Sequence, residues 1–187
     1  NKGVTRVLAL STDKACNPVN LYGATKLASD KIFIAGNAYA GAENTAFSVV
    51  RYGNVVGSRG SVVAHFRALA PTGRLPVTDA RMTRFWITLA QAVAWVRAGL
   101  ELMQGGEIFV PKLPSMKIVD LARAVAPEAA IDVVGIRPGE KLHEEMIGVE
   151  AARHALDCGD HYIIQPDMEW WPRGRSGGTP LPDGFSY

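Results

Sequence analysis

The chain has 187 residues, of which 48% are hydrophobic and 20% charged, and its formal net charge is +2. This composition excludes a disordered or fibrous protein, and so small a charge leaves no electrostatic footprint for nucleic acid or an anionic membrane. No apolar run approaches the roughly 18 residues of a transmembrane helix. The two cysteines, Cys16 and Cys158, form no C-x-x-C pair and support no disulfide framework. We therefore expect a globular protein of the cytoplasm, with no nucleic-acid or membrane partner.

The first part of the chain predicts a βαβ unit. Residues 7–10 read as a buried strand, Asn20 as the N-cap of a helix over 21–39, and residues 45–52 as a second buried strand. A strand, a helix and a strand within about 50 residues imply a parallel sheet. Because the chain does not begin with Met and enters its first strand by Val7, we expect a piece of a longer protein.

The second part of the chain predicts shorter elements. Helices are expected over 61–69, 89–103 and 118–125, with one or two helical turns over 142–147. Extended segments are expected over 85–87, 107–110, 131–135 and 162–165, and irregular chain after residue 169. The predicted fold class is α/β.

The densest group of chemically useful side chains follows the first strand. Residues 11–14 read Ser-Thr-Asp-Lys, at the strand end where open parallel sheets bind ligands. Tyr22 and Lys26 follow at a spacing of four, on one face of the predicted helix, where an ammonium stabilises a phenolate and makes a tyrosine a usable base. Chance supplies such a Tyr–Lys spacing in about one chain in five. Its place after the strand and the Pro18 loop is what favours a functional pair.

A glycine-rich segment follows the second strand. Gly53, Gly57 and Gly60 imitate a dinucleotide-binding turn, but their spacing is G-x3-G-x2-G and not G-x-G-x-x-G. With Asn54 and Arg59 the segment could hold a phosphate through backbone N–H groups. The alternative is a plain connection without a ligand.

Two groups of basic residues look more specific than scattered surface charge. Arg84 directly precedes Phe-Trp, and Arg137 and Lys141 flank Pro-Gly-Glu. A guanidinium can bind a diphosphate through two parallel hydrogen bonds. The histidines have no metal-ligand spacing, so we expect no metal site; they are His65, His143, His154 and His161.

Residues 10–32, LSTDKACNPVNLYGATKLASDKI, closely resemble the extended short-chain dehydrogenase/reductase superfamily. Within it they look like the inverting UDP-N-acetylglucosamine 4,6-dehydratases that begin pseudaminic acid synthesis. Four more runs are similar to that family in the same order: RYGNVVGSRGSV, RMTRFWIT, GGEIFVPKLPSMKIVDLA and GIRPGEKLHEEM. The resemblance covers the C-terminal part of the family, because its Gly-rich NADP loop has no counterpart here.

The resemblance implies the C-terminal part of a Rossmann-type parallel sheet with a smaller α/β substrate-binding domain. Residues 1–60, with 85–104 returning to them, are expected in a partial dinucleotide-binding domain. Residues 61–84 and 105–168 are expected in a nucleotide-sugar-binding domain, and 169–187 in an irregular tail. The resemblance also implies a homo-oligomer.

The family's chemistry can be carried onto particular residues. Tyr22, helped by Lys26, would take the O4 proton of the sugar while hydride passes from C4 to NADP. Lys14 would remove the C5 hydrogen and Asp13 would protonate the departing C6 hydroxyl. Thr12 would hydrogen-bond near O4. Because successive side chains of extended chain point to opposite faces, Asp13 and Lys14 can reach one sugar only if the chain turns at Asp13.

The family's binding residues also have counterparts here. Tyr22, Lys26 and Ser11 would contact NADP. The residues that would hold UDP-N-acetylglucosamine are Asn54, Arg84, Arg137 and Glu140.

Three features separate the inverting enzymes from their relatives. Retaining hexose dehydratases resemble this frame but carry Glu where Lys14 stands, simple 4-epimerases lack the Asp-Lys pair, and longer membrane-bound relatives tend to have Met at the Tyr22 position. Two alternatives stay open: another nucleotide-sugar epimerase or dehydratase of the superfamily, or a non-catalytic UDP-sugar-binding relic. We expect the 187-residue chain alone to be inactive, because a hydride shuttle needs its cofactor.

Overall fold

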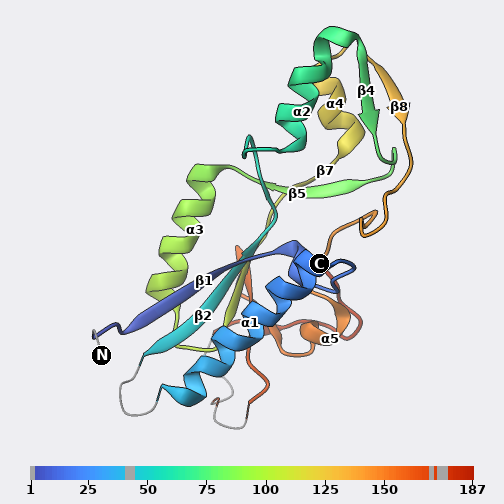
Figure 1. Cartoon of the computed structure of the whole chain (residues 1–187). Helices are drawn as coiled ribbons and strands as arrows, with labels where there is room; N and C mark the ends of the chain where they lie inside the picture. The colour runs from blue at the N-terminus through green and yellow to red at the C-terminus, as the bar shows by residue number, and fades with distance from the viewer. Residues whose placement is uncertain (1–2, 41–44, 169–170, 172–176) are drawn as a thin grey trace. The chain divides into compact units, whose positions relative to one another are not determined.

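The computed structural model of the chain describes residues 3–40, 45–168, 171 and 177–187. They divide into two compact units, whose elements are labelled in Figure 1. The first unit draws its residues from 1–52, 90–112 and 145–187, and the second from 53–89 and 113–144. The chain therefore leaves the first unit twice and returns to it twice.

The predicted βαβ unit is confirmed in the first unit. Strand β1 (Arg6–Thr12) and strand β2 (Ala46–Tyr52) pair in parallel over their whole length, and helix α1 (Leu21–Tyr39) connects them. Asn20 caps α1 as expected, because its Oδ1 accepts a hydrogen bond from the Gly23 N–H at 2.8 Å. The strand ends that were expected to carry chemistry thus lie at one edge of the sheet.

The sheet continues beyond β2 with a change of direction. The strand order is β1-β2-β6-β10-β9-β11. Strand β6 (Ile108–Pro111) is parallel to β2, whereas β10 (His161–Ile164) and β9 (Ala155–Asp157) are antiparallel to their neighbours. Strand β11 (Thr179–Pro180) lies in the expected irregular tail and pairs with β9. The expected strand at 162–165 is confirmed, while β9 and β11 were missed.

The helix expected over 142–147 is wrong. The N–H groups of Met146 and Ile147 both donate to the carbonyl oxygen of Tyr187, so they cannot form helical bonds within their own segment. The Tyr187 N–H in turn donates to the Ile147 carbonyl at 2.8 Å. A short helix, α5 (Val149–Ala152), begins only after Gly148.

Both faces of the sheet in the first unit are covered. Phe47 of β2 packs against Phe33 of α1, with ring centroids 6.4 Å apart. On the opposite face Val50 packs with Phe109, Met103 and Trp95 under helix α3 (Leu89–Leu102). Since adjacent residues of β2 point to opposite faces, the strand is apolar on both, as a central parallel strand should be.

The second unit has its own small core. A sheet of β3 (Asn54–Val55), β5 (Thr83–Ile87) and β7 (Ser115–Lys117) lies beside a parallel pair, β4 (Arg74–Val77) and β8 (Ala130–Val133). Helices α2 (Val62–Leu69) and α4 (Ile118–Val125) pack with these strands around Phe66, Leu75 and Val77, which are fully buried. The sequence indicated α2, α4, β5 and β8 but not β4, whose four residues include a proline.

The bounds of the two units differ from those expected of the two domains. Residues 105–112 and 145–168 were expected in the second domain, but β6 pairs with β2 and β10 pairs with β6 in the first unit. Residues 53–60 and 85–89 were expected in the first domain, but β3 pairs with β5 in the second unit. Strand pairing between distant segments, which local sequence does not reveal, sets these bounds.

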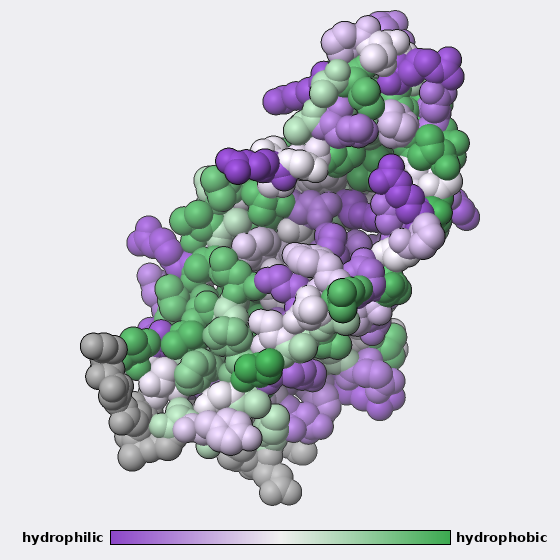
Figure 2. Space-filling model, in the orientation of Figure 1, coloured by the Kyte–Doolittle hydropathy of each residue, from purple (hydrophilic) through white to green (hydrophobic). Residues whose placement is uncertain are grey.

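The first unit leaves apolar side chains on its surface. Figure 2 shows them, in green, over α3 and the neighbouring part of β1, and the exposed apolar residues of these two elements include Leu10, Val93 and Leu102. Within the described residues β1 pairs with β2 alone, so its other edge is open. Such an edge is a surface that another strand can cover. No helix among the described residues is long and apolar enough to cross a bilayer.

Candidate active site

The chain turns at Asp13, as it must if Asp13 and Lys14 are to reach one sugar. Strand β1 ends at Thr12 and passes into a single 3-10 turn, Asp13–Ala15. The Thr12 hydroxyl oxygen accepts a hydrogen bond from the Lys14 N–H at 3.4 Å, and the Cys16 N–H donates to the Asp13 carbonyl at 3.0 Å. Main-chain hydrogen bonds and the Thr12 hydroxyl therefore stabilise the turn. The turn brings the side chains of Asp13 and Lys14 to the same side of the chain.

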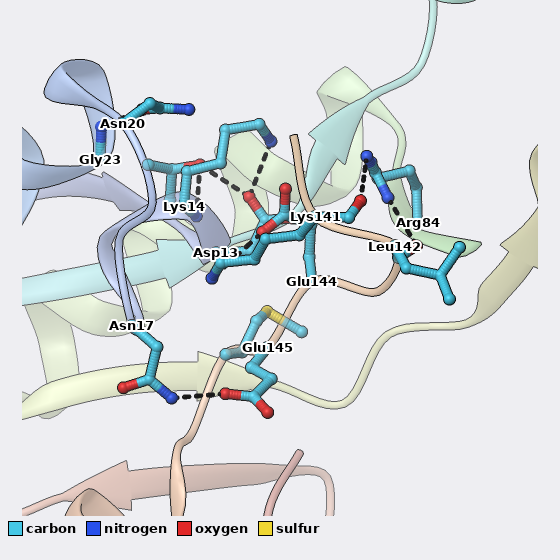
Figure 3. Close-up of polar contacts among 12 residues, drawn as sticks. Asp13, Lys14, Asn17, Asn20, Gly23, Arg84, Lys141, Leu142, Glu144 and Glu145 are labelled. Carbon is cyan, nitrogen blue, oxygen red and sulfur yellow. Dashed lines mark hydrogen bonds and ion pairs between the residues drawn. The ribbon is translucent and has the colours of Figure 1, made fainter. Parts of the chain in front are cut away.

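Asp13 and Lys14 form an ion pair at this turn. Lys14 Nζ lies 2.9 Å from Asp13 Oδ1, and the same oxygen accepts a hydrogen bond from the Thr12 hydroxyl at 2.8 Å (Figure 3). Asp13 is fully buried, whereas the Lys14 side chain is 31% exposed. The second carboxylate oxygen, Asp13 Oδ2, is buried and has no hydrogen-bond partner among the described residues. A buried carboxylate oxygen without a partner is costly and is typical of a functional group.

Tyr22 and Lys26 lie on the first turns of α1, four residues apart on one helix face. Lys26 Nζ donates to the Leu10 carbonyl of β1 at 3.0 Å, which ties this face of the helix to the strand that carries Asp13. Tyr22 is half exposed. Tyr52, at the end of β2, lies near it: burial, and then the neighbouring Tyr22 phenol, raise the pKa of Tyr52 above its ordinary value.

Helix α1 starts in direct contact with the turn. A Cβ at Gly23 would lie 2.4 Å from the Lys14 carbonyl oxygen and 2.9 Å from Pro18 Cβ. Only glycine allows so close an approach, so the distance between the helix bearing Tyr22 and the turn bearing Lys14 is fixed by backbone contact.

The loop after the turn is anchored by Asn17. This residue has a positive φ of 44°, which asparagine tolerates better than most residues. Its Nδ2 donates to Glu145 Oε2 at 2.6 Å (Figure 3). A segment more than a hundred residues further along the chain thus holds the loop that joins the turn to α1.

Ser11 points into the interior. Its hydroxyl donates to Asp30 Oδ2 of α1 at 2.9 Å, and Arg51 Nη2 lies 3.0 Å from the same oxygen. Sequence reasoning gave Ser11 a cofactor contact and did not single out Asp30 or Arg51. A signal existed in each case: Asp30 lies eight residues after Tyr22 on the inward face of the helix, and Arg51 interrupts an apolar strand.

The structure gathers some of the expected sugar-binding residues within the second unit. Arg84 donates to the carbonyl oxygens of Thr83, Leu142 and Lys141 at 2.7, 3.2 and 3.0 Å. It therefore holds the end of the Arg-Pro-Gly-Glu-Lys run, at Lys141, and the residue after it. Glu140 Oε2 accepts from the Arg137 N–H at 3.4 Å within that run.

Asn54 and the glycines after β2 also lie in the second unit. Asn54 belongs to the short strand β3 and is half-buried. A Cβ at Gly53 would lie 2.5 Å from Phe85 Cβ, so Gly53 permits the close approach of two strands. Gly57 and Gly60 have φ values of 72° and 73°. Gly53 therefore has a packing role, while the positive φ and the open space at Gly57 and Gly60 fit a plain connection and a phosphate-binding loop alike.

One cavity of about 620 Å³ lies within the first unit, between α1 and the segment around residues 148–168. Cys16, Asn17 and Asp30 line it, whereas Asp13, Lys14 and Tyr22 do not. The cavity is therefore separate from the expected catalytic groups.

The segment before β5 carries a local ion pair whose effect on acidity can be measured. The Arg81 guanidinium and N–H hydrogen-bond the Asp79 carboxylate at 2.8–3.0 Å and lower its pKa to about 2 from an ordinary 3.8. Arg81→Ala is expected to return the pKa of Asp79 toward 3.8, as measured by NMR titration of the carboxyl carbon. Because the folded-state pKa is depressed, the stabilising effect is full above pH 3.8 and is lost as the pH falls toward 2.

The matched control for this titration is Arg74→Ala. Arg74 hydrogen-bonds Asp132 in the same unit and lowers the pKa of that carboxyl instead. This variant should raise the pKa of Asp132 and leave Asp79 unchanged. An Asp79 that titrates identically with and without Arg81 would contradict the assignment.

The parallel sheet with helices on both faces defines a Rossmann-type α/β protein, and comparison with known proteins gives its family. Residues 1–166 match the family model described as polysaccharide biosynthesis protein, and the chain belongs to that family, within the extended short-chain dehydrogenase/reductase superfamily.

Particular relatives narrow the resemblance. The chain is 53% identical, over an alignment of 195 residues, to the inverting UDP-N-acetylglucosamine 4,6-dehydratases of two Campylobacter jejuni strains. These alignments cover 99% of this chain and 58% of each relative, so the chain spans a little over half the length of the curated relatives it matches.

Solved structures agree with the fold. The crystal structure of Pen from Bacillus thuringiensis superposes with a TM-score of 0.87 at 31% identity, covering 100% of this chain and 56% of that one. An NAD-dependent NDP-hexosamine 5,6-dehydratase of tunicamycin biosynthesis superposes with a TM-score of 0.61 at 23% identity, covering 76% of this chain and 54% of that one.

Proposed function

We propose that this chain supplies the acid–base residues and the sugar-binding unit of an inverting 4,6-dehydratase that acts on UDP-N-acetylglucosamine. The observation that carries the proposal is the Asp13–Lys14 pair on a turn that contacts the helix bearing Tyr22 and Lys26. The product would be a UDP-4-keto-6-deoxy-L-sugar. The 53% identity to the Campylobacter enzymes supports the same assignment.

The residues divide the reaction between them. Tyr22 takes the O4 proton, and Lys26 stabilises the phenolate that does so. The 4-ketone that results makes the C5 hydrogen acidic, and Lys14 removes it as a proton. Asp13 donates a proton to the C6 oxygen, which leaves as water. When bound, the nicotinamide cofactor, which we propose is NADP, supplies the hydride exchange between C4 and C6. With hydride at C6, a proton returns to C5 from the face opposite the one that lost it, which inverts C5 and balances the proton that Tyr22 took from O4.

The ion pair bears directly on these roles. To act as a base, Lys14 must be a neutral amine, and to act as an acid, Asp13 must be a protonated carboxyl. In the ion pair Lys14 is instead protonated and Asp13 is deprotonated. Passage of one proton from Lys14 Nζ to Asp13 Oδ1, over the 2.9 Å that separates them, gives both required forms at once without a proton from solvent. After Lys14 has taken the C5 proton and Asp13 has given one to the leaving hydroxyl, the ion pair is restored.

The residues present fit a nicotinamide at this edge. Lys26 is held at the carboxyl end of β1, and Tyr22 is half exposed beside it. Ser11 is committed to Asp30, so the fit rests on Tyr22 and Lys26. The phosphate-binding glycine loop of the family has no counterpart in this chain, and we propose that the residues that bind the pyrophosphate lie outside it.

For the nucleotide sugar we propose contacts from Asn54, Arg84, Arg137 and Glu140 of the second unit. Arg137 is exposed and suits a bidentate diphosphate contact. Arg84 donates to three carbonyl groups and so shapes the Arg137–Lys141 run. By family resemblance we further propose a cytoplasmic homo-oligomer whose product enters a pseudaminic acid or related surface-glycan pathway.

The test is dehydration of UDP-N-acetylglucosamine in D2O by the protein produced from its complete coding sequence. We expect loss of water and deuterium at C5 with inverted configuration, read by mass spectrometry and NMR. Retained configuration at C5 would indicate a retaining dehydratase, and a C4 epimer without water loss would indicate an epimerase. Sugar binding without turnover would favour the non-catalytic relic. The 187-residue chain produced alone serves as the control and should show no turnover.

A further inference from the structure

A buried carboxylate joins three elements behind the proposed catalytic edge. Asp30 of α1 is 1% exposed, and its Oδ2 accepts hydrogen bonds from Ser11 of β1 and Arg51 of β2 at 2.9 and 3.0 Å. Arg51 is also buried, and its Nη1 donates to the Met146 carbonyl at 2.8 Å. The Ser11–Asp30–Arg51 network therefore ties one helix, two strands and a distant segment at a single point.

Ser11 and Asp30 are close in sequence to proposed catalytic residues, and Arg51 joins them from β2. Ser11 directly precedes Thr12, Asp13 and Lys14. Asp30 lies four and eight residues after Lys26 and Tyr22, so the three side chains lie along one face of α1. A change in the rotation of α1 about its axis would move Tyr22 and Lys26 relative to the turn, and the bonds to Asp30 oppose that rotation.

The network is a costly way to hold the fold together. Burying an ion pair carries a desolvation penalty that well-packed apolar residues avoid. Arg51 Nε, moreover, is buried without a hydrogen-bond partner among the described residues. Polar bonds fix direction and register in a way that apolar contacts do not. The arrangement therefore points to positioning.

We infer that Asp30, with Ser11 and Arg51, is a positioning residue for the proposed reaction: it sets the reach of Tyr22 and Lys26 toward the sugar held at Asp13 and Lys14. The inference rests on the proposed function and assigns Ser11 to this network. A misplacement of about 1 Å in a reacting group can cost about 10²-fold in rate.

The first unit offers a matched control at the other end of the sheet. Glu107, which precedes β6, is also 1% exposed, and it accepts hydrogen bonds from Ser48 of β2 at 2.6 Å and from the Gln104 and Gly105 N–H groups at 2.9 and 2.8 Å. It is thus a buried carboxylate bonded to a strand serine, as Asp30 is. It lies at the amino end of β2, away from the proposed catalytic edge.

The experiment compares Asp30→Asn with Glu107→Gln in the protein produced from its complete coding sequence. Both are expected to lower the melting temperature. Asp30→Asn should lower kcat by about 10- to 100-fold, leave the sugar KM within about threefold and shift the pH profile of kcat, while Glu107→Gln should leave kcat and the profile unchanged. Equal kcat losses in the two variants, or an unchanged kcat in Asp30→Asn, would overturn the inference.

Two further measurements separate the possible failures. If Asp30→Asn does not fold, Arg51→Lys keeps the buried charge but not the two-pronged guanidinium, and it should show the same loss of kcat at constant KM; full activity in that variant would also overturn the inference. A wild-type protein that does not release water from UDP-N-acetylglucosamine refutes the proposed function itself, whatever the variants do.

Discussion

Asp13→Asn is expected to stop the loss of water and to slow hydrogen exchange at C5 without abolishing it, whereas Lys14→Gln is expected to stop both. The physical reason is the division of roles on the turn. Lys14 removes the C5 proton once the 4-ketone has formed, and Asp13 protonates the departing C6 hydroxyl. Without the Asp13 carboxylate, Lys14 has to lose its own proton to solvent before it can act as a base. Loss of a general acid or base lowers rates by about 10²–10⁴-fold, so each variant should fall by that order in product formation.

The measurement is deuterium at C5 in the recovered UDP-N-acetylglucosamine after incubation in D2O, together with the rate of product formation. Lys112→Gln is the control, because Lys112 is a 33% exposed lysine 2.8 Å from Asp157 in the same unit. Removing that ion pair should change neither exchange nor product formation. Hydrogen exchange at C5 that survives in Lys14→Gln would show that Lys14 is not the base that removes the C5 proton.

Tyr22→Phe is expected to abolish C5 exchange and water loss together. Without the phenol the O4 proton is not taken, the 4-ketone does not form, and the C5 hydrogen stays unreactive. We expect kcat to fall by about 10²–10⁴-fold with the sugar KM little changed, because the hydroxyl contributes mainly in the transition state. The readouts are the same exchange and product assays.

Tyr52→Phe distinguishes the two neighbouring phenols. Burial and the Tyr22 phenol raise the pKa of Tyr52, so it remains neutral through the physiological pH range and is no base there. Its neutral form is favoured by folding, so this stabilising effect is full below the ordinary pKa of 10.0 and is lost as the pH rises through the higher folded value. Tyr52→Phe should therefore keep most of the activity at neutral pH. A loss equal to that of Tyr22→Phe would contradict this assignment of the base.

The elements that the sequence predicted best are those whose hydrogen bonds are local. Helix α1 has the predicted bounds because Asn20 caps it and its bonds run within the segment. The segment 142–147 was misread because its N–H groups at Met146 and Ile147 bind Tyr187, a partner forty residues away. For the same reason the sequence did not reveal that β10 runs antiparallel to β6.

The residues of the candidate site also differ in whether local sequence reveals them. Thr12, Asp13, Lys14, Tyr22 and Lys26 could be singled out because strand end and helix start follow one another in the chain. The need for a turn at Asp13 was also foreseeable from the alternation of side chains, and the 3-10 turn confirms it. The sequence marks Asp30 and Arg51 as unusual polar residues, but it does not reveal that they bond to each other and to Ser11. The Ser11–Asp30–Arg51 network depends on which sheet face α1 covers and on the register that places Ser11 opposite Arg51.

The turn at Asp13 has an evolutionary consequence. Its hydrogen bonds use the Lys14 N–H and the Asp13 carbonyl, and its contact with α1 uses the Lys14 carbonyl, so the backbone framework does not depend on which side chain stands at position 14. Lysine and glutamate codons differ by a single nucleotide. The family resemblance implies Glu at this position in retaining dehydratases, so we expect a Lys14→Glu change to leave the turn and its contact with α1 intact. The side chain that we propose meets C5 can therefore be exchanged without rebuilding the scaffold that presents it.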